Sequence, residues 1–226
     1  IVEGCEISNC VLSGGETAEL PDMYTENKFD LAGFALGAVE RKNLITKEKV
    51  EKGDIILGLP SSGFHSNGFS LIRKIISSNK IKLGDKFNFT KKTLGDELLT
   101  PTKIYVPLMN KINKMNIING IAHVTGGGLT ENIPRVLPPG KFSKIYRKSW
   151  EIPEIFTWLE KIGNISFEEM LKTFNCGIGM TLIIKEEHFH TIKNIFEQIN
   201  EEFFVIGEIT EDEGNPSVYF VNDKMG

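Results

Sequence analysis

The chain has 226 residues, of which 40% are hydrophobic and 25% charged, and it carries a formal net charge of −4. This length allows one large domain or two small ones. The acidic balance argues against a nucleic-acid binder, which would carry a basic face, and no stretch of the sequence approaches the ~20 apolar residues that a membrane span needs.

The cysteines and the start of the chain indicate the cellular setting. Cys5, Cys10 and Cys176 are an odd number and lack metal-ligand spacing. We therefore expect buried free thiols and a reducing, cytoplasmic location rather than a disulfide framework. No signal peptide is visible. The chain begins at Ile1 without a methionine, and we interpret it as a fragment that has lost pairing partners of its first strand.

The first segments alternate apolar runs with turns. Residues 1–7 are interpreted as the tail of a helix. Residues 10–12 and 31–39 are predicted to be buried strands, because both are apolar and the second is rich in small residues. The charged stretch 40–52 predicts a linker, and we place the domain boundary near Thr46, which gives domains 1–45 and 46–226.

A glycine turn follows the first predicted strand. Gly14 and Gly15 permit positive φ angles and the close approach of a ligand. Glu16 and Glu19 place two carboxylates beside this turn, and a sparse carboxylate set of this kind can hold the magnesium ion (Mg²⁺) of a nucleotide. An acidic surface loop is the alternative interpretation.

The stretch 61–73 concentrates hydroxyls, an imidazole, an amide and glycines in one turn. An apolar strand, residues 55–59, precedes the turn, and residues 69–76 have helical spacing. Backbone N–H groups at such a helix start can hold an anion, so phosphate is the first ligand to consider. The alternative is a capped turn in which Ser66 or Asn67 accepts from the first helical amides.

The turn after residues 119–124 repeats the arrangement of the turn after residues 10–12. Residues 119–124 predict a strand that leads into Thr125 and three glycines, and a helix follows that Pro134 limits. The two turns beside strands 10–12 and 119–124 share the order strand, hydroxyl, glycines and threonine. The repeat is short, and it favours a second anion-binding turn.

Strands and helices alternate along the remaining chain. The predicted helices are 103–115, 153–159, 166–171 and 187–199, and the predicted strands are 144–146, 174–184, 203–209 and 218–221. This alternation predicts an α/β (α+β) fold with helices over a mixed sheet.

Two of the four histidines lie beside glycine-rich turns. His65 and His123 lie where an imidazole can act at neutral pH as an acid, as a base or as a hydrogen-bond donor to phosphate. A structural hydrogen-bonding role is the alternative for each. His188 and His190 lie at a charged helix start, and we expect them to face solvent.

Five segments in order resemble the phosphoribosylformylglycinamidine cyclo-ligase family, the aminoimidazole ribonucleotide synthetases of purine biosynthesis. They are GGETAELP (14–21), SSGFHSNGFSLIR (61–73), AHVTGGG (122–128), ENIPRVL (131–137) and TFNCGIGM (173–180). The resemblance covers essentially the whole chain. It implies a two-domain synthetase architecture in which residues 1–45 are the end of an ATP-binding and dimerisation domain and residues 46–226 form the C-terminal α/β domain.

The resemblance implies an activity. An enzyme of this family uses ATP to activate the formyl oxygen of formylglycinamidine ribonucleotide, so that the amidine nitrogen closes the imidazole ring and ADP and phosphate are released. Such chemistry needs positioning and charge neutralisation more than a protein nucleophile. The implied cofactors are ATP and Mg²⁺, the implied assembly is a homodimer, and further strands that contribute to ATP binding are expected before the matching segment.

We assign the site residues in three groups. The ATP side comprises Gly14, Gly15, Glu16, Thr17 and Glu19, with Glu16 as the metal ligand; the substrate side comprises Ser62, Ser66, Asn67, Gly68, Thr125, Gly126 and Gly127; and the candidates for proton transfer are His65 and His123.

Two alternative functions stay open. Related ATP-using enzymes share the architecture, among them thiamine-monophosphate kinase, selenophosphate synthetase, a hydrogenase maturation protein and formylglycinamidine ribonucleotide amidotransferase. Asn67 and Asn175, in their full motifs, argue against them. The second alternative is a non-catalytic nucleotide-binding fragment.

Overall fold

The computed structural model describes residues 1–25 and 27–224, and these form two compact units. The first unit is Ile1–Leu44 and the second is Ile45–Gly226. Among the described residues, no helix combines the length and the apolar character that crossing a membrane requires.

The first unit contains little regular structure. Its helices are α1 (Val2–Ile7), which agrees with the expected helix tail, and the short 3₁₀ helix η1 (Arg41–Asn43). The predictions of strands at 10–12 and 31–39 are wrong: Val11 is 86% and Phe34 97% exposed, and neither segment pairs with another. A strand needs a neighbour for its backbone hydrogen bonds, and the described residues of this unit offer none.

The burial of the cysteines differs between the two units. Cys176, in the second unit, is buried as expected, whereas Cys5 is half-buried and Cys10 is exposed. The expectation of three buried thiols is therefore confirmed for Cys176 and wrong for Cys5 and Cys10, and Cys10 is exposed because its segment does not pack as a strand. All three thiols are free.

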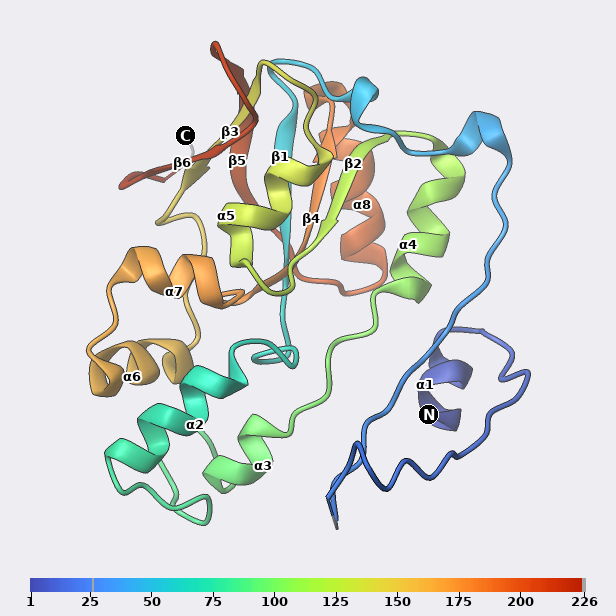
Figure 1. Ribbon diagram of the computed structural model, residues 1–226. Helices are drawn as coiled ribbons and strands as arrows, with labels where there is room; N and C mark the ends of the chain where they lie inside the picture. Colours follow the sequence, from blue (N-terminus) through green and yellow to red (C-terminus); the bar gives the residue numbers. More distant parts are fainter. Residues whose placement is uncertain (26, 225–226) are drawn as a thin grey trace. The chain divides into compact units, whose positions relative to one another are not determined.

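The second unit is built on a six-stranded mixed sheet in the order β2-β4-β1-β5-β3-β6 (Figure 1). Every neighbouring pair is antiparallel except β3 and β6, which are parallel. The strands are β1 (Ile55–Pro60), β2 (Ile118–His123), β3 (Lys141–Tyr146), β4 (Ile178–Ile184), β5 (Phe204–Glu211) and β6 (Val218–Val221). The predicted mixed sheet and α/β class are confirmed.

The helices of the second unit were largely predicted, although their ends differ by a few residues. They are α2 (Phe69–Ser78), α3 (Leu94–Leu98), α4 (Val106–Ile112), α5 (Gly128–Asn132), α6 (Glu154–Gly163), α7 (Phe167–Thr173) and α8 (Phe189–Gln198). Short 3₁₀ turns adjoin them: η2 (Lys47–Lys49), η3 (Asn113–Met115), η4 (Ile133–Val136) and η5 (Glu186–His188).

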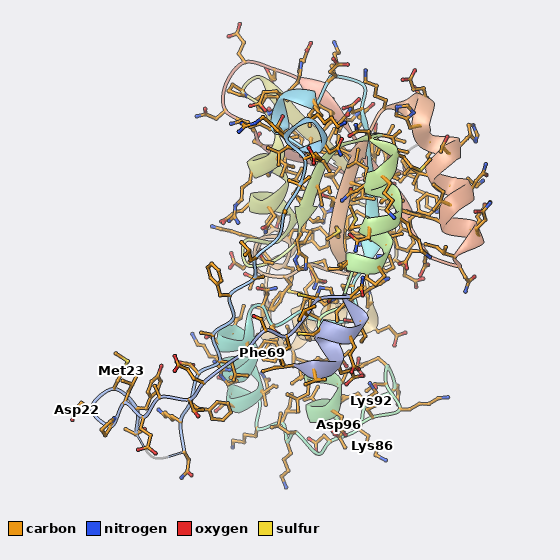
Figure 2. The ribbon with its side chains drawn as sticks, turned by 90° about the vertical axis from the view of Figure 1, so that its right-hand side faces the viewer. Asp22, Met23, Phe69, Lys86, Lys92 and Asp96 are labelled. Carbon is orange, nitrogen blue, oxygen red and sulfur yellow. The ribbon has the colours of Figure 1, made fainter. Side chains whose placement is uncertain are left out.

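Two apolar clusters lie on the two faces of the sheet. Successive residues of a strand point to opposite faces, so Leu57 joins one cluster and Ile56 the other. Helices α4 and α8 pack in the cluster of Leu57, and α2, α3, α5, α6 and α7 contribute to the cluster of Ile56. Figure 2 shows Phe69 at the first turn of α2 and the exposed side chains of Lys86, Lys92 and Asp96 around α3.

The direction of three strands defines one edge of the sheet. Both β1 and β2 run antiparallel to β4, so β1 and β2 are parallel to each other and end where β4 begins. The register places Pro60 of β1 opposite Ile178 and His123 of β2 opposite Met180. The segments that follow β1 and β2 therefore leave the sheet at the same edge (Figure 1).

Candidate functional site

Three segments meet at this edge: the loop of residues 61–68 after β1, the turn of residues 124–128 after β2, and residues 174–177 before β4. Backbone hydrogen bonds fix the start of the segments that follow β1 and β2, since Ser61 N donates to Gly177 O at 2.8 Å and Val124 N donates to Gly179 O at 2.9 Å. A Cβ atom added to Gly126 would lie 3.9 Å from Asn67 Oδ1, so the loop and the turn are neighbours. The structure thus brings together the residues assigned to the substrate side.

The loop of residues 61–68 has an unusual backbone. His65 and Ser66 have φ angles of 51° and 61°, in the left-handed region that L residues seldom adopt. Such residues cost about 1–3 kcal/mol each and persist only where the surroundings hold them. Here Asn67 holds them, because its N–H donates to Phe64 O at 3.1 Å and its Nδ2 donates to His65 O at 2.8 Å.

The capped-turn alternative for Ser66 or Asn67 is not what the structure shows. The residue before α2 is Gly68 with a φ angle of 73°, and no side chain accepts from the first helical amides. Gly68 is required at this position, because a Cβ atom there would overlap the Phe174 ring. The Ser66 side chain is exposed, and the Asn67 amide is used inside the loop.

His65 is an interior residue of the loop, with 4% of its surface exposed. Its Nε2 accepts from Ser62 N at 2.9 Å and from Lys103 N at 3.3 Å. Two backbone donors at Nε2 place the proton of the neutral ring on Nδ1. Nδ1 is buried and has no hydrogen-bond partner among the described residues. The Ser62 hydroxyl donates to Pro101 O at 2.6 Å and also lies 3.0 Å from Nε2.

Tyr105 completes a cluster of three rings, and sequence reasoning missed it. Its ring centroid lies 6.2 Å from that of His65 and 5.9 Å from that of His123, and the two histidine rings are 6.4 Å apart. The Tyr105 hydroxyl donates to Pro60 O at 2.8 Å. The sequence contained no signal for this role, because Tyr105 fell within the helix expected at 103–115, which in the structure begins at Val106.

The environment keeps all three rings uncharged at neutral pH. Burial, followed by the proximity of His123 and Lys103, lowers the pKa of His65 to about 4. Partial burial also lowers the pKa of His123, although its side chain is exposed at the end of β2. Burial and, to a lesser degree, Glu201 raise the pKa of Tyr105. His123 is therefore the neutral imidazole of the cluster that a ligand can reach.

The turn of residues 124–128 is held from within by Asn132. Asn132 Nδ2 donates to Gly128 O at 2.8 Å and to Gly126 O at 3.2 Å, and Thr125 Oγ1 donates to Asn132 Oδ1 at 3.2 Å. Gly127 has a φ angle of 96°, and Gly126 is exposed. The turn is therefore a fixed backbone surface with no side chain at its exposed point.

The residues assigned to the ATP side lie in the first unit. Gly14 and Gly15 are exposed, and a Cβ atom added to either would meet no atom within 4 Å. Glu16 and Glu19 are exposed as well. The described residues contain no group of three His, Cys, Asp or Glu side chains that could hold a metal ion.

A cavity of about 380 Å³ lies elsewhere, beside the free edge of β2. Its lining comprises Ile45, Thr46, Lys47, Gly120, Ile121, Arg135 and Val136. None of the residues assigned from the sequence lines this cavity. The candidate site is therefore the surface at the end of β1 and β2, and not this cavity.

Comparison with known proteins identifies the family that this chain resembles. Residues 51–219 match the family described as AIR synthase related protein, C-terminal domain. The chain is 47% identical over 216 residues to the phosphoribosylformylglycinamidine cyclo-ligase of Neisseria meningitidis, and the match covers 95% of the chain and 62% of that protein. The protein of the same name from Caldanaerobacter subterraneus is 48% identical, and 64% of it is covered.

A solved structure shares the fold. The chain superposes on thiamine-monophosphate kinase from Stenotrophomonas maltophilia with a TM-score of 0.54 and 14% identity, over 83% of this chain and 56% of that one. At this identity the likeness concerns the fold alone. The chain spans somewhat less than two thirds of the length of the curated relatives described above.

Proposed function

The chain belongs to the AIR synthase related family, and we propose from this membership that the full-length protein is a phosphoribosylformylglycinamidine cyclo-ligase of purine biosynthesis. The proposed reaction closes the imidazole ring of aminoimidazole ribonucleotide from formylglycinamidine ribonucleotide and releases ADP and phosphate. The observation that carries the proposal is the meeting of the loop of residues 61–68 and the turn of residues 124–128 at one sheet edge, within a chain 47% identical to enzymes of that name.

We assign substrate binding to that edge. Ser62, Ser66, Asn67 and Gly68 provide one side, and the turn Thr125, Gly126 and Gly127 provides the other. The exposed backbone of Gly126 suits a phosphate group, since no side chain prevents close approach. Both sides are braced by internal hydrogen bonds, and a braced site binds a charged ligand with little reorganisation.

We assign proton transfer from the amidine to His123, with His65 as its inner neighbour. A group that accepts a proton at neutral pH must be uncharged and within reach of the substrate. His123 meets both conditions, because its pKa is lowered and its side chain is exposed. His65 has its Nε2 occupied by two backbone donors and its Nδ1 buried, so it is the weaker candidate.

The nucleotide side of the proposal rests on the first unit. We propose that Ile1–Leu44 is the end of an ATP-binding and dimerisation domain, in which Gly14, Gly15, Glu16, Thr17 and Glu19 contact ATP. When bound, ATP supplies the phosphoryl group that turns the formyl oxygen into a leaving group. Glu16 would offer Mg²⁺ one carboxylate oxygen, and the phosphate oxygens of ATP and water would supply the other ligands.

The proposal extends to assembly and location. We propose a cytoplasmic homodimer for the full-length protein, as the family resemblance implies. Light scattering coupled to size exclusion chromatography measures the assembly directly, and a monomeric mass would contradict the dimer.

The test of the function is an assay of ADP release by the full-length gene product. We expect release that depends on formylglycinamidine ribonucleotide, with the imidazole ribonucleotide as the second product. Release that depends on thiamine monophosphate or another acceptor would replace the proposal with a related kinase, and ATP binding without turnover would replace it with a non-catalytic nucleotide-binding protein.

A matched pair of variants tests the assignment of His123. We expect His123→Gln to lower kcat by about 10²-fold, as for the loss of a general base. The control is His190→Gln, which makes the same change on the exposed surface of α8 and should leave kcat unchanged. Equal rates for both variants would reject proton transfer by His123.

A further inference from the structure

Asn175 is buried, with 1% of its surface exposed, and has no role in the function proposed above. It lies directly before β4 and uses both ends of its amide. Its Nδ2 donates to Gly63 O at 2.7 Å, and its Oδ1 accepts from Ser61 Oγ at 3.0 Å and from Gly177 N at 2.9 Å. One side chain therefore joins the start of β4 to two positions of the loop of residues 61–68.

The residues around Asn175 also touch the rest of the site. The Phe174 ring packs directly on Gly68, at the far end of the same loop, so that no Cβ atom would fit there. On the other side, a Cβ atom added to Gly128 would overlap Leu171 O and lie 2.7 Å from Phe174 O. The chain that carries Asn175 is thus packed against both the loop of residues 61–68 and the turn of residues 124–128.

We propose that Asn175 is a positioning residue that sets the loop of residues 61–68 relative to the turn of residues 124–128. An amide is suited to this position, because it donates to the Gly63 carbonyl and accepts from Ser61 and Gly177 at the same time. A carboxylate can only accept, and an apolar side chain would leave the buried Gly177 N and the half-buried Ser61 Oγ and Gly63 O without this partner. The inference deepens the proposed function, since the loop and the turn are the two sides of its substrate site.

Asn175→Asp tests the inference on the chain as it is. The substitution keeps the shape and the two accepted bonds, but the carboxylate cannot donate to Gly63 O. We expect the loop amides of Ser61 and Asn67 to exchange with deuterium about tenfold faster or more, because the half-buried hydrogen bond to Gly63 O is lost. The amides of Leu57 and Leu182, inside the sheet, should keep the wild-type rate.

Two further variants make the result decisive. Asn79→Asp is the matched control, since Asn79 Nδ2 also donates to a carbonyl, Ile75 O at 2.9 Å, at the other end of α2. Ser61→Ala removes the bond to Asn175 Oδ1 by a smaller change, and it decides the question if Asn175→Asp does not fold. Faster exchange at Ser61 and Asn67 in Asn79→Asp, or wild-type exchange in both other variants, would overturn the inference.

Kinetics of the full-length protein separate positioning from general stability. We expect Asn175→Asp to raise KM for formylglycinamidine ribonucleotide about tenfold. KM for ATP should be unchanged. A rise in both KM values would contradict a role confined to the loop. Absence of turnover in the wild type would reject the proposed function, whereas the exchange experiment would still decide the role of Asn175.

Discussion

His65 is the buried titratable side chain nearest to the proposed chemistry, and its proton equilibrium has a measurable consequence. The pKa of His65 is lowered to about 4 in the folded chain, by burial first and then by His123 and Lys103, whereas a free imidazole has a value near 6.5. Between these values the unfolded chain binds the proton and the folded chain does not. The stability associated with neutral His65 is therefore complete above pH 6.5 and is lost as the pH falls towards 4.

We predict that the unfolding free energy of the wild type falls by about 2 kcal/mol more than that of His65→Gln between pH 7.5 and pH 5. Urea denaturation at the two pH values measures this difference. The comparison with the variant cancels the contribution of other groups that titrate in this range, including His123. Identical pH dependence of the two proteins would show that His65 titrates normally.

Gly179 offers a second prediction for a single residue. A Cβ atom at Gly179 would overlap the Tyr105 hydroxyl and lie 2.5 Å from His65 Cε1. Tyr105 has little freedom to move, because its hydroxyl is bonded to Pro60 O. We expect Gly179→Ala to lower the unfolding free energy by about 1–3 kcal/mol, as overpacked cores do.

The matched control for Gly179→Ala is Gly84→Ala, since a Cβ atom at Gly84 meets no atom within 4 Å. This variant should change stability by no more than about 0.5 kcal/mol. Denaturation of both variants in parallel measures the difference. Equal stability of the two variants would mean that the packing between β4, Tyr105 and His65 is looser than described.

Helix α7 tests the structure at the level of elements. Ser166 precedes it, and the Ser166 hydroxyl accepts from Glu169 N at 3.2 Å. We expect Ser166→Ala to cost about 1 kcal/mol of stability through the loss of this N-terminal cap. Ser77→Ala, at an exposed position of α2, is the control and should be nearly neutral. A neutral Ser166→Ala would contradict the cap.

The elements also show what the sequence could and could not predict. Strand β1 and helix α2 were predicted within a few residues, because their apolar spacing coincides with burial in the second unit. The strand expected at 31–39 has the same apolar character but pairs with no segment in the described part of the chain, and pairing is a non-local property. A local sequence pattern predicts a helix or strand correctly only where other segments supply the packing and pairing that the element needs.

The same distinction applies to the site. His65, His123 and Asn67 were found from their motifs, and the structure places them at one sheet edge. His65 Nε2, in contrast, accepts from the backbone amides of both Ser62 and Lys103, and the sequence contained no sign of the second contact. Tyr105 was missed for the same reason, because only the fold brings its ring beside the rings of His65 and His123.

At the scale of the whole molecule, the folded core belongs to one unit. Every buried hydrophobic side chain of the described residues lies between Val50 and Ile209. We therefore predict that residues 45–226, produced alone, keep the fold. Their melting temperature should stay within about 4 °C of that of the whole chain, which corresponds to about 1–2 kcal/mol for a domain of this size. Loss of cooperative melting would show that residues 1–44 are needed for the second unit to fold.

We propose that the edge formed by the loop of residues 61–68 and the turn of residues 124–128 binds the ribonucleotide. Titration of the chain with formylglycinamidine ribonucleotide, followed by amide NMR spectra, tests it most directly. We predict saturable shifts at Ser62, Asn67 and Gly126, and none at Lys86 or Lys92 around α3. Shifts confined to the cavity of Thr46 and Arg135, or no shifts at the edge, would contradict the claim.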